Sequence, residues 1–261
     1  MLLDIYQVDA FATEVFRGNP AAVIPLERWL PDSLMQAIAA ENNLSETAFL
    51  VPEGPDWGLR WFTPAVEVDL CGHATLASAW VLFNRRGVVA PAVTFKTRSG
   101  ALTVRPGADG RLTMDFPSRP GEPVVAPAAL VPALGAAPRE VLASRDYLVV
   151  YDDPAVVRGL SPDFAALASL DRFGIIATAP GDDGFDCVSR FFAPGEGIDE
   201  DPVTGSAHCT VAPYWAARLG KTAVRAYQAS ARGGILDCTV VGDRVTLTGD
   251  CAFYLEGKIN V

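Results

Sequence analysis

The sequence predicts an α+β protein of two pseudo-symmetric domains, each a barrel-like β-sheet wrapped around a central helix. The first observation behind this prediction is an internal repeat, because motifs of the first half recur in the same order in the second half. The second is that each half contains a helix, starting at a glycine, that is apolar on nearly every side. A helix of that kind must be surrounded by other elements. Strands dominate the rest of each half, so strands are expected to surround it.

The repeat consists of short segments that keep an offset near half the chain length, with a small insertion in the second acidic loop. The matched segments are ETAFLVP with GIIATAP, RWFTP with RFFAP, Gly72-His73-Ala74 with Gly205-Ser206-Ala207, Arg98-Ser99-Gly100 with Arg232-Gly233-Gly234, and DGRLTM with GDRVTL. Chance does not readily produce so many matches in one order. We interpret the pattern as an ancient duplication.

The domain boundary is expected between residues 118 and 139, where Pro, Ala and Gly accumulate and periodicity is lost. The first domain is therefore predicted to cover residues 1–117, with the C-terminal strand 251–261 as a candidate for completing it. The second domain is predicted to cover residues 122–250.

In chain order, each half alternates strand-like runs with two helical segments. The first helix of each half is expected at Pro31-Asp32 and at Pro162-Asp163, with Asp32 as a candidate N-cap. The second helices are the apolar ones. The runs that read as strands are 2–11, 21–26, 46–52, 92–100, 101–107 and 111–117 in the first half, and 174–180 and 190–194 in the second. The apolar helices are expected from Ala74 to Arg86 and from about Gly205 to Gly220.

Composition limits the function classes. Lys and Arg number 21 against 31 Asp and Glu, and the net charge of −10 disfavours nucleic acid and anionic membranes as partners. No leader or bilayer-spanning run is recognisable. The five cysteines are odd in number and form no C-x-x-C pair, which indicates reduced thiols in a cytoplasmic protein. No dinucleotide or P-loop motif is present, so we expect no nucleotide cofactor.

The heads of the two apolar helices are the candidate binding sites. Backbone N–H groups at a helix start have no intrahelical partner, and the helix dipole favours an anion there. One head follows an acidic, glycine-rich loop with Glu196, Asp199, Glu200 and Asp201. If both heads face one cleft, they would bind a small carboxylate there.

The candidates for acid/base chemistry are few. Glu46 starts a strand and is a candidate general base or acid, and alignment of the halves puts Gly174 in its place in the second half. His73, directly after the glycine of its helix head, is a second candidate, whereas His208 reads as a structural histidine inside its helix. Asp201 could orient a histidine or the substrate, or act only as an N-cap. Ser206 corresponds to His73 and could donate a hydrogen bond to an anion.

Two alternatives stay open at this point. Cys71 lies beside a helix start, where a thiol can deprotonate a carbon acid, so a cysteine-dependent racemase or epimerase is one reading. The second half has no cysteine at the matching place, which disfavours two-thiol chemistry. The second alternative is a metal site formed by the acidic loop and the histidines, although no spacing typical of metal ligands is recognisable. A serine hydrolase is disfavoured because the G-x-S-x-G elbow is missing.

Four segments together resemble the signature segments of the phenazine-biosynthesis-like (PhzF) family, and the resemblance covers essentially the whole chain. They are DAFATEVFRGNPAAVIPL, NLSETAFL, RWFTPAVEVDLCGHATLASAW and SRFFAPGEGIDEDPVTGSAHC. The resemblance implies the diaminopimelate-epimerase-like fold. It also implies a cofactor-independent isomerase without a metal, usually a homodimer, that acts on a small carboxylated substrate.

Carried over residue by residue, the resemblance implies a catalytic glutamate at Glu46, with His73 and Asp201 as further catalytic residues. It implies that Ser45, Gly72, Gly205 and Ser206 line the substrate. A non-catalytic protein that binds small carboxylates is a further alternative, and the resemblance does not settle the substrate.

Overall fold

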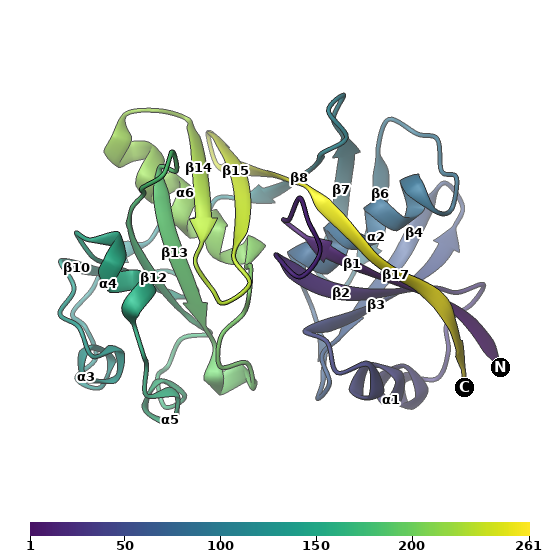
Figure 1. The fold of residues 1–261 in the computed structure, drawn as a ribbon, viewed down its shortest axis with the longest axis horizontal. Coiled ribbons are helices and arrows are strands. Elements are labelled where there is room, and N and C mark those ends of the chain that lie inside the picture. Colours follow the sequence, from purple (N-terminus) through teal and green to yellow (C-terminus); the bar gives the residue numbers. More distant parts are fainter. The chain divides into compact units, whose positions relative to one another are not determined.

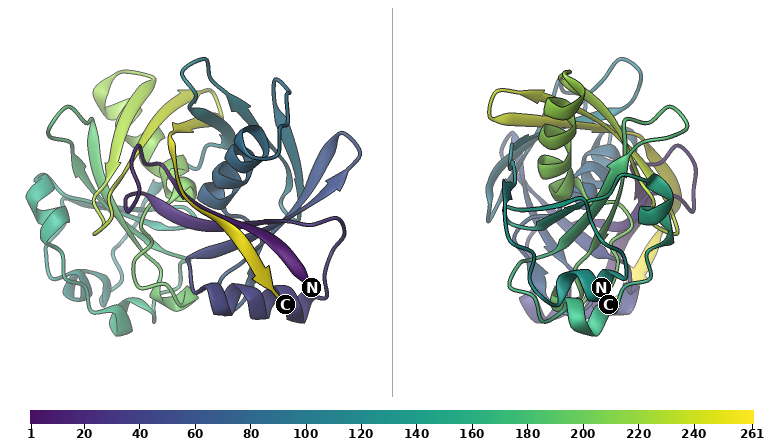
Figure 2. Two further views of the ribbon diagram at one scale, coloured as in Figure 1. Left: turned by 45° about the vertical axis from the view of Figure 1, so that its right-hand side comes forward. Right: turned by 90° about the vertical axis from the view of Figure 1, so that its left-hand side faces the viewer.

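The structure is a computed structural model that describes all 261 residues and divides into two compact units. The first unit comprises Met1–Asp115 with Thr248–Val261, and the second comprises Phe116–Leu247. The C-terminal strand β17 (Cys251–Asn260) pairs antiparallel with β1 (Leu2–Ala10), so both ends of the chain contribute to the first unit (Figure 1). Figure 2 shows the two termini side by side, and the Val261 N–H donates to the Met1 carbonyl.

The elements of the first unit follow the expected alternation. After β1 come β2 (Asn19–Pro25), α1 (Asp32–Asn42), β3 (Glu46–Glu53), β4 (Asp56–Phe62), β5 (Glu67–Val68), α2 (Gly72–Asn84), β6 (Val93–Thr97), β7 (Gly100–Pro106) and β8 (Leu112–Pro117).

The second unit adds short helices to the same scheme. Its elements are β9 (Glu122–Pro123), α3 (Leu130–Leu134), β10 (Glu140–Ala143), β11 (Tyr147–Val150), α4 (Pro154–Gly159), α5 (Phe164–Leu167), β12 (Ile175–Pro180), β13 (Cys187–Phe192), the 3-10 turn η1 (Pro194–Glu196), α6 (Gly205–Leu219), β14 (Ala223–Gln228), β15 (Gly234–Val241) and β16 (Arg244–Gly249).

The strand pairings repeat between the units in the order that the sequence repeat predicts. In the first unit β1·β2 is antiparallel, β2·β3 parallel, β3·β4 antiparallel, β4·β6 parallel and β6·β7 antiparallel. In the second unit β10·β11, β11·β12, β12·β13, β13·β14 and β14·β15 have the same directions in the same order. The two halves therefore share one topology, and the predicted α+β class is confirmed.

Each unit is built around its apolar helix. Nine of the residues of α2 are buried, and α2 packs against β1, β2, β3, β7 and β17. Nine of the residues of α6 are buried as well, and α6 packs against β14 and β15. A helix with so many apolar side chains must be enclosed, and the strands of each unit pack around it. No helix is long and apolar enough to cross a bilayer.

The expected cap of α1 is wrong. Pro31 is the N-cap residue and no side chain caps the helix, because the Asp32 carboxylate instead accepts a hydrogen bond from Arg60 at 2.9 Å. The matching prediction in the second half holds in part. Asp163 does cap α5 through the Ala166 N–H, but α5 runs only from Phe164 to Leu167.

Candidate active site

The head of α2 brings two of the predicted catalytic residues into contact. Glu46 begins β3, and α2 packs across this strand, so the second residue of the helix lies beside the first residue of the strand. His73 Nε2 lies 3.0 Å from Glu46 Oε2, and both side chains are buried. A buried carboxylate paired with an imidazole is an arrangement that can hold and transfer a proton.

The other ring nitrogen of His73 has two neighbours. Asn19 Nδ2 lies 3.0 Å from His73 Nδ1, and Cys71 Sγ lies 3.5 Å from the same atom. In the neutral ring, donation by the amide makes Nδ1 the acceptor and places the proton on Nε2, where it faces Glu46. Asn19 therefore orients the imidazole.

Gly18 is what lets Asn19 reach this position. Its φ of +63° lies in the left-handed region that favours glycine, and a Cβ there would lie 2.2 Å from the Ala10 carbonyl oxygen. The turn therefore passes against the end of β1 and feeds Asn19 directly into β2.

The Cys71 thiol and the His73 imidazole of this cluster differ in how their surroundings shift their pKa values. Burial raises the pKa of the Cys71 thiol to about 11, so the thiol is uncharged near neutral pH. Burial by itself lowers the pKa of His73, but the interactions of the ring with Cys71 and Glu46 outweigh burial and raise that pKa well above the ordinary value. Because Cys71 is a neutral thiol at pH 7, Glu46 is the neighbour that favours protonation of the His73 imidazole.

The same three side chains are close enough to share one ion. The ligand atoms of Glu46, Cys71 and His73 all lie within 4.8 Å of one another, and a thiol, an imidazole and a carboxylate are ligands that Zn²⁺ accepts. The expectation of a metal-free enzyme stays a prediction.

The acidic loop of the second half, the other candidate metal site, uses its carboxylates for contacts within the protein. Glu200 pairs with Arg190, and Asp201 accepts a hydrogen bond from Thr204.

Matching arginines hold the loops that lead into both helix heads. Arg60 binds Glu67 through two hydrogen bonds of 2.7 Å, and Arg190 binds Glu200 through hydrogen bonds of 2.7 and 2.8 Å. Arg190 also donates to the Leu160 carbonyl at 2.6 Å. Bidentate pairs of this kind fix geometry as well as charge. The repeated R-x-F segments are therefore fixed points for the two loops.

At the head of α6, Asp201 is part of a buried network. Thr204, the N-cap residue, donates its hydroxyl hydrogen to Asp201 Oδ2 at 2.5 Å. Gln228 accepts the Thr204 N–H at 2.7 Å and donates to the Asp201 carbonyl at 2.7 Å. Asp201 is therefore not the N-cap. Its carboxylate is held by a hydroxyl, and its backbone is fixed from β14.

His208 lies one turn inside α6 and is fully buried. Its Nδ1 donates to the Thr204 carbonyl at 2.8 Å, and its Nε2 accepts from Ser189 Oγ at 3.5 Å. No carboxylate compensates for burial, so burial lowers the pKa of His208 to about 4. This geometry suits a neutral, structural histidine.

Three of the four predicted substrate-lining residues lie at the two helix heads, and the fourth lies just before β3. Ser45 directly precedes β3, and Gly72 opens α2. Gly205 and Ser206 are the first two residues of α6. Neither N-cap residue caps its helix through its own side chain, although the Gln228 side chain accepts the Thr204 N–H at the head of α6.

The second half has no room for a counterpart of Glu46. Gly174 directly precedes β12, and a Cβ there would lie 2.3 Å from Phe191 Cζ and 3.2 Å from Asp146 Oδ1. The aromatic ring fills the space that a glutamate stem would need. The two units therefore share their topology but only one has a carboxylate at this position.

Sequence reasoning missed Asn19, Thr204 and Gln228. Asn19 is the first residue of β2, and nothing local in the sequence shows that its amide reaches a histidine far along the chain. No sequence motif indicated a role for Thr204 or Gln228. One sequence feature could have pointed to Asn19, because this residue lies inside the first of the four signature segments.

Comparisons with known proteins decide the family. The family model described as phenazine biosynthesis-like protein matches residues 8–257. The chain belongs to this family. An uncharacterized isomerase of Pseudomonas aeruginosa is 55% identical over 261 residues, covering 100% of both chains.

Solved structures agree at the level of the fold. A PhzF-family protein of Enterococcus faecalis is 48% identical and covers 100% of both chains, with a TM-score of 0.96. A hydroxyproline epimerase from Agrobacterium vitis has a TM-score of 0.63 at 11% identity, covering 99% of this chain and 92% of its own. At that identity the likeness shows a shared fold alone. The expected family and epimerase-like fold are both confirmed.

Proposed function

We propose that this PhzF-family chain is a cofactor-independent isomerase that moves a proton within a small carboxylated substrate, with Glu46 as the general acid/base. The observation that carries the proposal is the 3.0 Å contact between Glu46 and His73 in the buried head of α2. Family membership and the isomerase names of relatives support it.

In this proposal, ionised Glu46 removes a proton from one carbon of the substrate and returns it to another. The electron pair of the broken C–H bond moves into the substrate's conjugated system, so nothing is oxidised or reduced. His73 stabilises the ionised carboxylate before transfer, and Asn19 holds its ring in place. A substrate carboxylate is assigned to uncapped helix N–H groups, which favour anions.

The head of α6 is assigned supporting roles. Asp201 is proposed as a further catalytic residue, and Ser206 with Gly205 as substrate-binding groups. Ser45 and Gly72 are assigned to substrate binding in the same way. Support comes from the motif resemblance and from the hydrogen bonds that fix Asp201. The resemblance also supports a homodimer.

The test is deuterium incorporation from D₂O, measured by mass spectrometry, with a panel of small cyclic carboxylates and cyclic amino acids as probes. We expect Glu46→Gln to slow incorporation by about 10²- to 10⁴-fold, the usual contribution of a general acid or base. The matched control is Glu196→Gln, a carboxylate exposed in the second acidic loop. Undiminished exchange in Glu46→Gln would refute the assignment.

A cysteine-dependent racemase or epimerase is the second candidate, favoured by the 3.5 Å contact of Cys71 with His73. The raised pKa of the thiol counts against it. It requires that Cys71→Ala abolish turnover of the probe panel, whereas the leading proposal expects the variant to stay active.

A third candidate, a binding protein without turnover, would be favoured if panel members raise the melting temperature of the protein but none exchanges deuterium.

A further inference from the structure

Strand β17 presents an accessible edge in the first unit. β1 pairs with β2 on one side and with β17 on the other, and residues 254–256, 258 and 260 of β17 are exposed. Tyr254 and Leu255 are 45% and 40% exposed, which is high for large apolar side chains. An exposed edge strand presents unpaired N–H and C=O groups and is a template for another strand.

The order of side chains along this edge is self-complementary. Leu255, Glu256, Gly257, Lys258 and Ile259 place an acid and a base on either side of a glycine, and apolar residues outside them. When two copies pair antiparallel about Gly257, Glu256 of each copy faces Lys258 of the other. Leu255 then faces Ile259 of the second copy. A two-fold axis generates such reciprocal contacts, since residue i meets j and j meets i.

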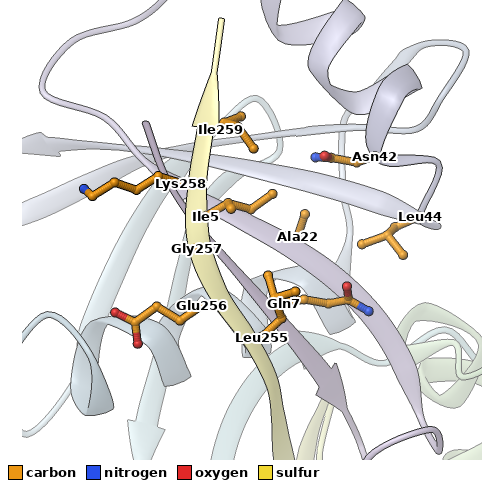
Figure 3. A pocket seen from close by; sticks show the side chains of 10 residues that line it. All are labelled: Ile5, Gln7, Ala22, Asn42, Leu44, Leu255, Glu256, Gly257, Lys258 and Ile259. Atoms are coloured by element: carbon orange, nitrogen blue, oxygen red, sulfur yellow. The ribbon is translucent and has the colours of Figure 1, made fainter. Parts of the chain in front are cut away.

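The face of β17 that carries Leu255 and Ile259 borders a groove of about 360 Å³ that is lined by both apolar and polar residues. Ile5 and Ala22 form its floor, and Asn42 and Leu44 lie across it (Figure 3). Figure 3 shows Glu256 and Lys258 pointing away from this groove. In the antiparallel pair the apolar residues of both copies would meet on the groove face.

The charges sit on the opposite face and are only partly used within the chain. Lys258 contacts Asp4 at 2.5 Å and Glu256 lies 3.9 Å from Arg85, yet their side chains remain 58% and 55% exposed. Charged residues on an edge often prevent pairing, and a run of one sign would do so here. Opposite signs on either side of Gly257 instead favour pairing with a second copy in the antiparallel sense.

We propose that two copies of this chain associate through β17, paired antiparallel and centred on Gly257. The inference rests on the homodimer proposed above and names its interface, and it is independent of the chemistry assigned to Glu46. The occupant is a second copy because the same five residues supply both halves of every predicted contact.

The test is the mass of the full chain in solution, measured by light scattering after size-exclusion chromatography over a range of concentrations. We expect wild type at twice the mass of one chain. Lys258→Glu or Glu256→Lys creates two like-charge pairs per dimer and should raise the dissociation constant by about 10- to 100-fold. The double variant Glu256→Lys with Lys258→Glu restores opposite charges and should restore the dimer. Arg139→Glu, at an exposed ion pair with Asp152 in the second unit, is the matched control.

Hydrogen–deuterium exchange of the wild-type chain keeps the proposal testable if a variant fails to fold. Amides of residues 254–260 should become more protected as protein concentration rises. A monomeric wild type would overturn both the homodimer and its interface. A dimer that neither single reversal weakens, or that shows no concentration-dependent protection at β17, would overturn the interface alone. Neither result bears on the Glu46→Gln exchange test.

Discussion

The heads of α2 and α6 occupy matching places in the two units, and each is followed by a buried histidine. At the head of α2 the histidine meets Glu46 and a neutral thiol, so the cluster can carry a mobile proton. At the head of α6 the histidine meets a hydroxyl and a carbonyl, and Gly174 with Phe191 takes the place of the carboxylate. Duplication thus preserved the strands and the helix, while a few side chains gave His73 a carboxylate partner and His208 only uncharged partners.

The largest expected effect separates the two histidines by pH. The pKa of His208 is lowered to about 4, so the native state excludes a proton that the unfolded chain binds below about 6.5. Stability contributed by neutral His208 is therefore present above pH 6.5 and lost as pH falls toward 4, by up to about 3 kcal/mol. Urea unfolding of wild type and His208→Gln across this range checks it. If His208→Gln loses as much stability as wild type when the pH falls, the loss comes from other groups.

His73 should show the opposite dependence. Its pKa is raised, so its contribution is complete below about pH 6.5 and is lost as pH rises through its folded-state pKa. In the exchange assay, His73→Gln should slow deuterium incorporation by about 10- to 100-fold, as expected for losing the close contact between the imidazole and the Glu46 carboxylate. His208→Gln, assayed near neutral pH, should stay close to wild type. Equal losses in both variants would remove the distinction between the helix heads.

The arginine pairs offer a smaller contrast between the same two regions. Arg190 contacts Glu200 and the Leu160 carbonyl, whereas Arg60 contacts Glu67 and the more exposed Asp32. Lysine cannot reproduce a bidentate pair, so Arg190→Lys should lower the free energy of unfolding by about 1–2 kcal/mol and Arg60→Lys by less. Urea midpoints of the two variants measure this directly. The reverse order would show that the carbonyl contact contributes little.

The smallest expected effect concerns metal. Since the proposed chemistry needs only Glu46 and its neighbours, prolonged dialysis against a chelator should leave the exchange rate unchanged. Metal analysis of the protein before and after dialysis supplies the control. A loss of exchange that Zn²⁺ restores would instead make Glu46, Cys71 and His73 a metal site.

Sequence patterns predicted the fold through features that are local. An apolar helix must be enclosed whatever surrounds it, and a repeated order of strands implies a repeated topology. Glu46 at the start of a strand and the glycine-headed helices were also predictable, because turn and helix signals mark their positions. Asp32 failed as a cap because Arg60, distant in sequence, binds its carboxylate.

The sequence by itself thus determined two matched units, one central helix in each, and the short set of polar residues at the helix heads. Only the tertiary structure decided that Asn19 orients His73, that Gln228 fixes Asp201, and that Phe191 leaves no room for a second Glu46. Such contacts join residues that lie far apart in the chain. Their distances depend on how strands pair and how the helix packs on them, and neither is encoded in any one segment.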